Sequence, residues 1–224
     1  TSVPVDSFDF FDSIIHPMDS NNHKNDTELH KIKTNVVSPI SLIDKNEMLT
    51  KENVLQRFGI PSNSKVFYVQ LGAGKINDIN SEIRMVIDAI LEDELSYVVL
   101  GESLLGDRLS LDMPRVRTIR DYPNCIYFNG FDFSVQAGGY NSFHEMRIMQ
   151  IPTLFLPNLE TGMDDQMARC VIAEDEGWGI VDRLRTKNSI KEALQQLPSR
   201  NKMTIDYANG ADEVAAMILG DLNG

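Results

Sequence analysis

The stretch FSVQAGGYNSFHEMRIMQIPTLFLP, residues 133–157, decides the fold. It opens with a short apolar run that predicts a strand, and Gly138 and Gly139 follow close behind. The residues after the glycines have helical spacing, and a second apolar run then ends at Pro157. A strand, a glycine turn, a helix and a further strand form the βαβ unit from which parallel sheets are built.

The same alternation continues from residue 65 to the C-terminal end of the sequence. Apolar and β-branched runs predict strands at 65–71, 96–101, 115–119, 125–128, 133–136, 152–156 and 178–181. Amphipathic patterns predict helices at 79–91, 142–149, 165–175, 189–196 and 211–219. The sequence therefore predicts an α/β, Rossmann-like fold, with a parallel sheet covered by helices on both faces. In such folds ligands bind beyond the carboxyl ends of the strands.

Residues 1–50 have a different pattern. The run FFDSIIHPMD (10–19) predicts one more strand, and the polar stretch at 20–31 predicts a loop. Residues 35–43 predict an extended connector. The sequence thus predicts the end of a preceding domain and its linker over 1–50, followed by one complete domain over 51–224.

Composition excludes several classes of protein. With 42% hydrophobic and 24% charged residues the chain is expected to be globular, and its formal net charge of −12 without a basic stripe argues against nucleic-acid binding. Cys125 and Cys170 lie in apolar runs, which predicts reduced core thiols. No apolar stretch is long enough to span a bilayer and the N-terminus is no signal peptide, so a cytoplasmic location is expected.

The turn at Gly138 and Gly139 has two explanations. Glycine allows positive φ and close packing of a helix on the sheet, or it lets a phosphate approach the amides of the next helix. Asn141 or Ser142 could cap this helix, and Glu145 would lie on the same face one turn later. Glu145 is then either a surface acid that stabilises the helix dipole or an acceptor for two ribose hydroxyls.

A second polar group follows the strand that ends at Pro157. Asp165 and Gln166 are expected at the start of a helix, again at the carboxyl edge of the sheet. A carboxylate beside an amide suits recognition of neighbouring sugar hydroxyls, whereas Asp164 or Asp165 could equally serve only as a helix cap.

In combination, these residues resemble the donor-side signature of the GT-B glycosyltransferases. The closest branch contains the UDP-N-acetylglucosamine transferase of peptidoglycan assembly and related UDP-glycosyltransferases. The matching elements are, in order, Gly138-Gly139, Asn141-Ser142, Glu145, Gln150-Ile151-Pro152 with glutamine in place of the usual glycine, Asp165-Gln166 and Arg169. YVQLGAG (68–74) resembles the first strand and glycine loop of the same domain. The resemblance extends from about residue 60 to the C-terminal end and implies one half of a GT-B fold.

The resemblance implies a set of residues that bind a UDP-sugar: Gly72, Gly74, Phe131, Gly138, Gly139, Asn141, Ser142, Glu145, Asp165, Gln166 and Arg169. The glycine corner and Ser142 would hold the diphosphate, and Glu145 would bind the ribose. Asp165 and Gln166 would read the transferred sugar, and Phe131 would lie near the uracil. The two glycines of the first loop would let that loop close over the donor. No cofactor and no bound metal are expected, since GT-B enzymes typically need none.

The implied activity is transfer of a hexose or N-acetylhexosamine from the UDP-sugar to an acceptor glycan, a lipid-linked sugar or a small molecule. The catalytic base usually comes from the acceptor domain, which here would be the domain that ends near residue 50, so no catalytic residue is assigned. Lipid-linked or cell-envelope acceptors would bring the protein to the inner face of the membrane as a peripheral protein.

Two other functions fit the same resemblance. Nucleotide-sugar hydrolases and UDP-sugar 2-epimerases share this fold and a similar Gly-Gly turn, and they differ in releasing free sugar or an epimer. Alternatively, the chain is a non-catalytic nucleotide-sugar-binding subunit of a split transferase.

One part of the sequence departs from the family pattern. Between the strand expected at 125–128 and the strand at 133–136, no residues remain for the helical crossover that parallel strands require. The sequence therefore indicates either an omitted stretch between Phe131 and Asp132, which we favour, or a different local topology. It also suggests an omission near Asn21 and Asn22.

Overall fold

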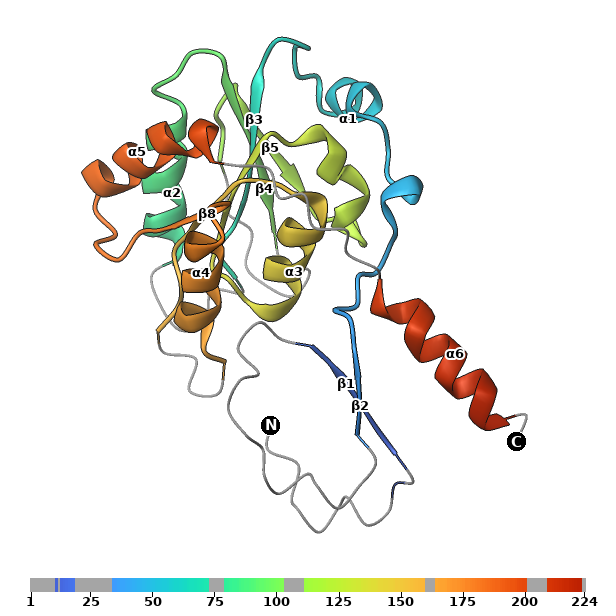
Figure 1. Cartoon of the computed structure of the whole chain (residues 1–224). Helices are drawn as coiled ribbons and strands as arrows, with labels where there is room; N and C mark the ends of the chain where they lie inside the picture. The colour runs from blue at the N-terminus through green and yellow to red at the C-terminus, as the bar shows by residue number, and fades with distance from the viewer. Residues whose placement is uncertain are drawn as a thin grey trace. The chain divides into compact units, whose positions relative to one another are not determined.

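The computed structural model describes residue 11 and residues 13–18, 34–72, 79–102, 111–159, 164–200 and 209–222. Their contacts form two compact units, one within 1–41 and 205–224 and the other within Leu42–Thr204. Figure 1 draws both units. Gly74 and the Asn21–Asn22 pair lie outside the described residues.

The larger unit is built on a six-stranded parallel sheet. Its strands are β3 (Lys65–Gln70), β4 (Ser96–Gly101), β5 (Val116–Ile119), β6 (Phe133–Gln136), β7 (Thr153–Phe155) and β8 (Gly179–Val181). They lie in the order β5-β4-β3-β6-β7-β8, and every neighbouring pair is parallel. The predicted Rossmann-like parallel sheet is thus confirmed.

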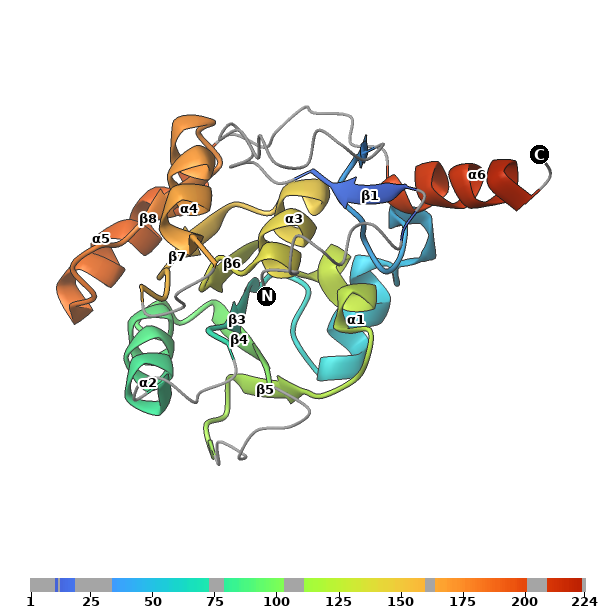
Figure 2. The same ribbon diagram turned by 90° about the horizontal axis from the view of Figure 1, so that it is seen from below.

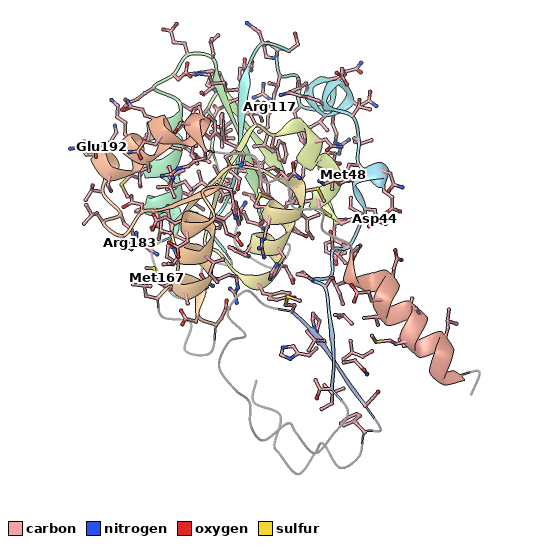
Figure 3. All side chains as sticks on the ribbon, in the orientation of Figure 1. Asp44, Met48, Arg117, Met167, Arg183 and Glu192 are labelled. Carbon is pink, nitrogen blue, oxygen red and sulfur yellow. The ribbon has the colours of Figure 1, made fainter. Side chains whose placement is uncertain are left out.

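Helices cover both faces of this sheet, as Figures 1 and 2 show. The helical elements are η3 (Lys45–Glu47), α1 (Lys51–Phe58), α2 (Ile79–Ile90), η4 (Asn124–Gly130), α3 (Tyr140–Met149), α4 (Gln166–Asp175), α5 (Lys187–Gln196) and η5 (Leu197–Ser199). Successive strand residues point to opposite faces, so Phe67 and Val69 pack with α2 and α5, whereas Val66 and Tyr68 pack with α1, η4, α3 and α4. Many charged side chains lie outside, for example that of the exposed Glu192 on α5 (Figure 3).

The strand expected at 125–128 is wrong, because these residues belong to the 3₁₀ helix η4. Cys125, Tyr127 and Phe128 are buried there, and a short apolar run cannot be assigned to a strand or a helix by periodicity alone. η4 is itself the connection from β5 to β6. The chain joins the sheet directly after it, since the amide of Asp132 donates to Val66 O at 2.9 Å. The reason for expecting an omitted stretch after Phe131 disappears.

One helix of the larger unit was not expected, and the state of the two cysteines was. The sequence patterns do not predict α1, which begins after the cap Thr50 and ends at Gly59 with φ of 61°. Cys125 and Cys170 are free and buried, as predicted. No helix in the described part of the chain has the length and apolar composition that a membrane span requires.

The smaller unit contains two parallel strands, β1 (Ile14–Pro17) and β2 (Thr34–Val37), and the helix α6 (Gly210–Leu222). β2 lies in the stretch expected as an extended connector. The chain after β2 is tied to the start of α6, since Ser38 N donates to Glu213 Oε1 at 3.3 Å and Gly210 N donates to Pro39 O at 3.1 Å. That this unit is the end of an acceptor domain stays a prediction.

Candidate functional site

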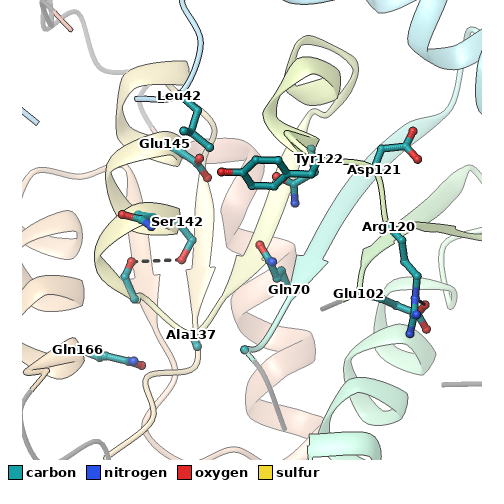
Figure 4. Close-up of a pocket in the computed structure, with 14 residues that line it drawn as sticks. Leu42, Gln70, Glu102, Arg120, Asp121, Tyr122, Ala137, Ser142, Glu145 and Gln166 are labelled. Carbon is teal, nitrogen blue, oxygen red and sulfur yellow. Dashed lines mark hydrogen bonds and ion pairs between the residues drawn. The ribbon is translucent and has the colours of Figure 1, made fainter. Parts of the chain in front are cut away.

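A cleft of about 340 Å³ opens at the carboxyl edge of the six-stranded sheet (Figure 4). The chain leaves β3 toward β4 and β5 and returns on the other side of β3 as β6, so the order of strands reverses between β3 and β6. Ligands of open α/β sheets bind at such a switch point. The lining residues are Leu42, Gln70, Gly72, Glu102, Arg120, Asp121, Tyr122, Asn124, Ala137, Gly139, Asn141, Ser142, Glu145 and Gln166.

One wall of the cleft is the N-terminal end of α3. The helix begins at Tyr140 with Gly139 as its N-cap, so the prediction that Asn141 or Ser142 caps it is wrong. Both residues lie in the first turn instead, where Ser142 Oγ donates to Gly139 O at 3.2 Å (Figure 4). Because first-turn amides have no acceptor within a helix and the cap glycine has no side chain, this end of α3 presents N–H groups and a positive dipole to the cleft.

The two glycines of this corner meet different surroundings. Gly138 has φ of 81°, and a Cβ there would lie 2.3 Å from the sulfur of Cys170. Gly139 lines the cleft, and the nearest atom to a Cβ built on it would be Ser142 Oγ at 3.7 Å. Gly138 is therefore required by the fold itself, whereas Gly139 leaves space that opens on the cleft.

Glu145 lies one turn into α3 and its side chain lines the cleft, half-buried. Burial raises the pKa of Glu145 to about 7, because the charged form loses hydration. Within the ranges that the structure describes, no side chain or amide donates a hydrogen bond to its carboxyl group. Figure 4 shows it pointing toward the Tyr122 ring across the mouth of the cleft. The position is not that of an ordinary surface acid.

The start of α4 brings Gln166 to the cleft and leaves Asp165 outside the lining. Gln166 is 8% exposed, and its amide is held on both sides: Oε1 accepts from Asn158 N, and Nε2 donates to Asp164 Oδ2, each at 3.0 Å. Asp165 is the N-cap of α4, with Oδ1 accepting from the amide of Ala168 at 3.0 Å.

Arg169 lies behind the glycine corner rather than in the cleft. It is 3% exposed, and its guanidinium donates to Gly138 O at 2.7 Å and to Asp164 Oδ1 at 2.8 Å. The ring of Tyr140 lies 5.8 Å from the same guanidinium. Arg169 thus places a buried positive charge directly beneath the corner and fixes the carbonyl that precedes Gly139.

The remaining predicted residues are spread more widely. Gly72 follows β3, lines the cleft and has φ of 96°, whereas Gly74 lies outside the described residues. Phe131 is 6% exposed and stacks on Tyr68 with centroids 5.1 Å apart, so it belongs to the core beneath the cleft.

The wall opposite α3 was missed by the sequence reasoning. It consists of polar residues that follow three strands: Gln70 at the end of β3, Glu102 after β4, and Arg120, Asp121, Tyr122 and Asn124 after β5. Arg120 Nε donates to Glu102 Oε2 at 2.7 Å. The rule that sites gather at carboxyl ends of strands could have found these residues, since each comes within a few positions of an expected strand end.

Among the described residues, no three His, Cys, Asp or Glu side chains come together in a way that could hold a metal ion. That donor binding proceeds without a metal stays a prediction.

No protein-family model and no curated protein sequence matches the chain. Solved structures share its fold. The glycotransferase of kitacinnamycin has a TM-score of 0.57 at 17% identity, over 75% of this chain and 41% of that one. The spinosyn forosaminyltransferase SpnP has a TM-score of 0.58 at 16% identity, over 84% of this chain and 46% of that one. The spinosyn rhamnosyltransferase SpnG, solved with thymidine diphosphate, has a TM-score of 0.54 at 16% identity, over 62% of this chain and 38% of that one.

These neighbours are GT-B glycosyltransferases, and the likeness confirms the fold that the sequence resemblance implies. At such low identity it is a likeness of fold alone. The chain spans less than half the length of each of the three structures.

Proposed function

We propose that this chain holds the donor-binding part of a glycosyltransferase that moves a hexose or N-acetylhexosamine from a UDP-sugar to an acceptor. One observation carries the proposal: the open N-terminus of α3 and the carboxyl group of Glu145, for which the described residues supply no donor, face the same cleft at the switch point. A nucleotide sugar fits both features, because its phosphates are anionic and its ribose has two adjacent hydroxyl donors.

The diphosphate would lie against the first turn of α3. Gly139 keeps that surface free of a side chain, and the buried guanidinium of Arg169, which is paired with Asp164, donates to Gly138 O behind it. Amides, helix dipole and guanidinium would together stabilise the charge that develops on a departing diphosphate. These groups offer a way to bind an anion in a chain with a net charge of −12, and to do so without a metal ion.

The ribose and the transferred sugar would occupy the two sides of the phosphates. Glu145 would accept hydrogen bonds from the ribose hydroxyls. Gln166 would contact the sugar, since its amide is fixed by Asn158 and Asp164 yet keeps one N–H and one lone pair for a ligand. The donor would therefore be bound by groups already in place.

The comparisons support glycosyl transfer in general terms, because the solved neighbours are glycosyltransferases and one of them, SpnG, holds thymidine diphosphate. The acceptor in our proposal is a glycan, a lipid-linked sugar or a small molecule bound by a further domain. That domain would also supply the catalytic base, so the residues described above are assigned to donor binding only.

Calorimetry tests the proposal. The full chain is titrated with UDP, UDP-glucose, UDP-N-acetylglucosamine and dTDP-glucose, and we expect the uridine compounds to bind. Glu145→Ala should weaken UDP binding by about 1.5–3 kcal/mol, the value of hydrogen bonds to a charged group. Glu192→Ala, which removes an exposed carboxylate on α5, is the matched control and should leave binding unchanged. Undiminished UDP affinity in Glu145→Ala, or no binding by the natural chain, would refute the proposal.

A further inference from the structure

Beneath the floor of the cleft, one buried hydroxyl group holds two side-chain amides. Tyr68 on β3 is fully buried, and its Oη donates to Gln70 Oε1 at 3.0 Å. Asn124, from the loop after β5, donates from Nδ2 to the same Oη at 2.5 Å. Gln70 and Asn124 both line the cleft, and Figure 4 shows Gln70 pointing into it. Each amide is therefore held by the Tyr68 hydroxyl and belongs to a residue that lines the cleft.

The shared hydroxyl gives the two amides opposite polarity. Burial, and to a lesser extent the nearby Glu145, holds the pKa of Tyr68 well above its usual value, so the hydroxyl keeps its single proton. The hydroxyl donates that proton to Gln70 Oε1 and accepts a hydrogen bond from Asn124 Nδ2 with one of its lone pairs. The shared hydroxyl consequently leaves Gln70 Nε2 as a donor and Asn124 Oδ1 as an acceptor for a ligand in the cleft. In the part of the chain that the structure describes, no further hydrogen bond involves either side-chain amide.

Tyr68 itself cannot shift easily. Its ring stacks on Phe131 with centroids 5.1 Å apart and an interplanar angle of 6°, and it contacts Phe128 at 5.1 Å. Its hydroxyl fills the space beside Gly101, where a Cβ would lie 2.4 Å from Oη. The donor and the acceptor on the cleft floor are thus fixed by the packed core, and reversing their polarity would require both amides to rotate together.

A donor next to an acceptor on one surface selects a ligand edge with the complementary pair. The acetamido group of a sugar does not fit, because in a trans amide the N–H and C=O point to opposite edges. A ring imide, such as that of uracil or thymine, has its N–H flanked by carbonyls on one edge. In the pose in which uracil places O4 against Gln70 Nε2 and N3–H against Asn124 Oδ1, cytosine would put its amino donor against a donor and its bare ring nitrogen against an acceptor.

We infer that Gln70 and Asn124 read the imide edge of a uracil or thymine base, with Tyr68 as the positioning residue. The inference rests on the proposed function and deepens it, since it assigns the base specificity of the same cleft to side chains to which the sequence resemblance gives no role. It also explains why a fully buried tyrosine lies under a ligand cleft: its hydroxyl serves the two amides rather than the ligand.

The test compares three ligands: UDP, UDP methylated on the imide nitrogen, and CDP. Each is titrated by calorimetry into the full chain and into Gln70→Met, Asn124→Leu and Tyr68→Phe. We expect the natural chain to prefer UDP by about tenfold, the effect of one or two hydrogen bonds. Each variant should reduce this preference to about twofold or less, with little change in the affinity for methylated UDP. Gln195→Met, on the exposed side of α5, is the amide-to-thioether control.

The outcomes separate this inference from the proposed function. Tyr68→Phe retains both amides, so loss of base preference there identifies positioning rather than contact. If that variant fails to fold, the two cleft substitutions decide the question, since both side chains are only half-buried. If the natural chain binds UDP-sugars but does not discriminate among the three ligands, or the variants discriminate as well as it does, the inference is overturned and the proposed function stands. If the natural chain binds no uridine compound, both are overturned.

Discussion

The two walls of the cleft are built in opposite ways. The α3 wall comes from one continuous stretch, 137–145, and its main groups, the first-turn amides and Glu145, are open to the cleft. The opposite wall comes from residues after three different strands, and its charged groups are already paired within the protein: Glu102 with Arg120, and Asp121 with Arg57 and Tyr127.

This difference indicates a division of labour. Open amides and an ionisable group with no protein donor gain most from a ligand, because burying them without a partner costs free energy. Groups that are already paired gain little from a ligand but keep a fixed shape. We therefore expect the α3 wall to supply affinity and the opposite wall to supply selectivity, and the following experiments test that expectation.

The largest effect is expected at the base of the α3 wall, from Gly138→Ala. The substitution would place a Cβ 2.3 Å from Cys170 and force an alanine into φ of 81°. Strain and overpacking together should lower the free energy of unfolding by about 2–5 kcal/mol. Urea denaturation followed by circular dichroism measures the loss. An unchanged midpoint would show that the corner can relax.

Gly139→Ala is the matched comparison, since the same methyl group is added one residue later. Its φ of −58° suits alanine, and the nearest atom would lie at 3.7 Å, so stability should change by less than about 1 kcal/mol. The methyl group would occupy the surface where the diphosphate approaches, and UDP affinity should fall about tenfold or more, roughly 1.4 kcal/mol. If Gly139→Ala binds UDP normally, phosphate contact with this corner is excluded.

The next effect is a pH dependence of donor affinity, which we expect from Glu145 and not from the paired carboxylates of the opposite wall. With a pKa of about 7, Glu145 is mostly neutral at pH 6 and mostly charged at pH 8. Because the carboxylate accepts hydrogen bonds better than the acid, affinity for UDP-glucose should rise about tenfold over this range. UDP-glucose is used because its diphosphate has no proton to lose there. Glu145→Gln should show a flat profile, and a rise that persists in this variant would assign the titration elsewhere.

The same group should influence the stability of the ligand-free protein. Its pKa is raised above the usual value of 4.5, so between about pH 4.5 and 7 the folded state binds more protons than the unfolded state. The free energy of unfolding should therefore fall as pH rises through this window, and Glu145→Gln should not share that part of the fall. Denaturation of both proteins at pH 5 and pH 8 measures the difference.

The sequence predicts what depends on neighbours along the chain. The apolar strands, the glycine corner and the approximate start of α3 and α4 are all local patterns. In the larger unit the observed bounds of the expected elements differ by only a few residues, except at η4, and α1 was not expected. The α3 wall was accessible for the same reason: Gly139, Asn141, Ser142 and Glu145 share one turn and a half of helix.

The strand-end rule marks the residues of the opposite wall one by one, but which of them meet could not be predicted, because that depends on which strands lie side by side. Gln70 and Asn124 are 54 positions apart and meet only through Tyr68. η4 was missed because seven residues with three buried apolar side chains fit a strand as well as a short helix. Phe131 was placed near the ligand by resemblance, whereas its burial against Tyr68 depends on the packing of the whole face.

The smallest effect is expected from Glu102→Gln in the opposite wall, and it tests whether that wall contributes charge or shape. The glutamine keeps the size of Glu102 and can still accept from Arg120, but the ion pair is lost. If the wall provides shape, UDP affinity and stability should both change by less than about 1 kcal/mol, as partly exposed ion pairs usually do. A large gain in UDP affinity would instead mean that Arg120, released from Glu102, binds the phosphates. Affinity would then come from both walls, and the division between them would have to be abandoned.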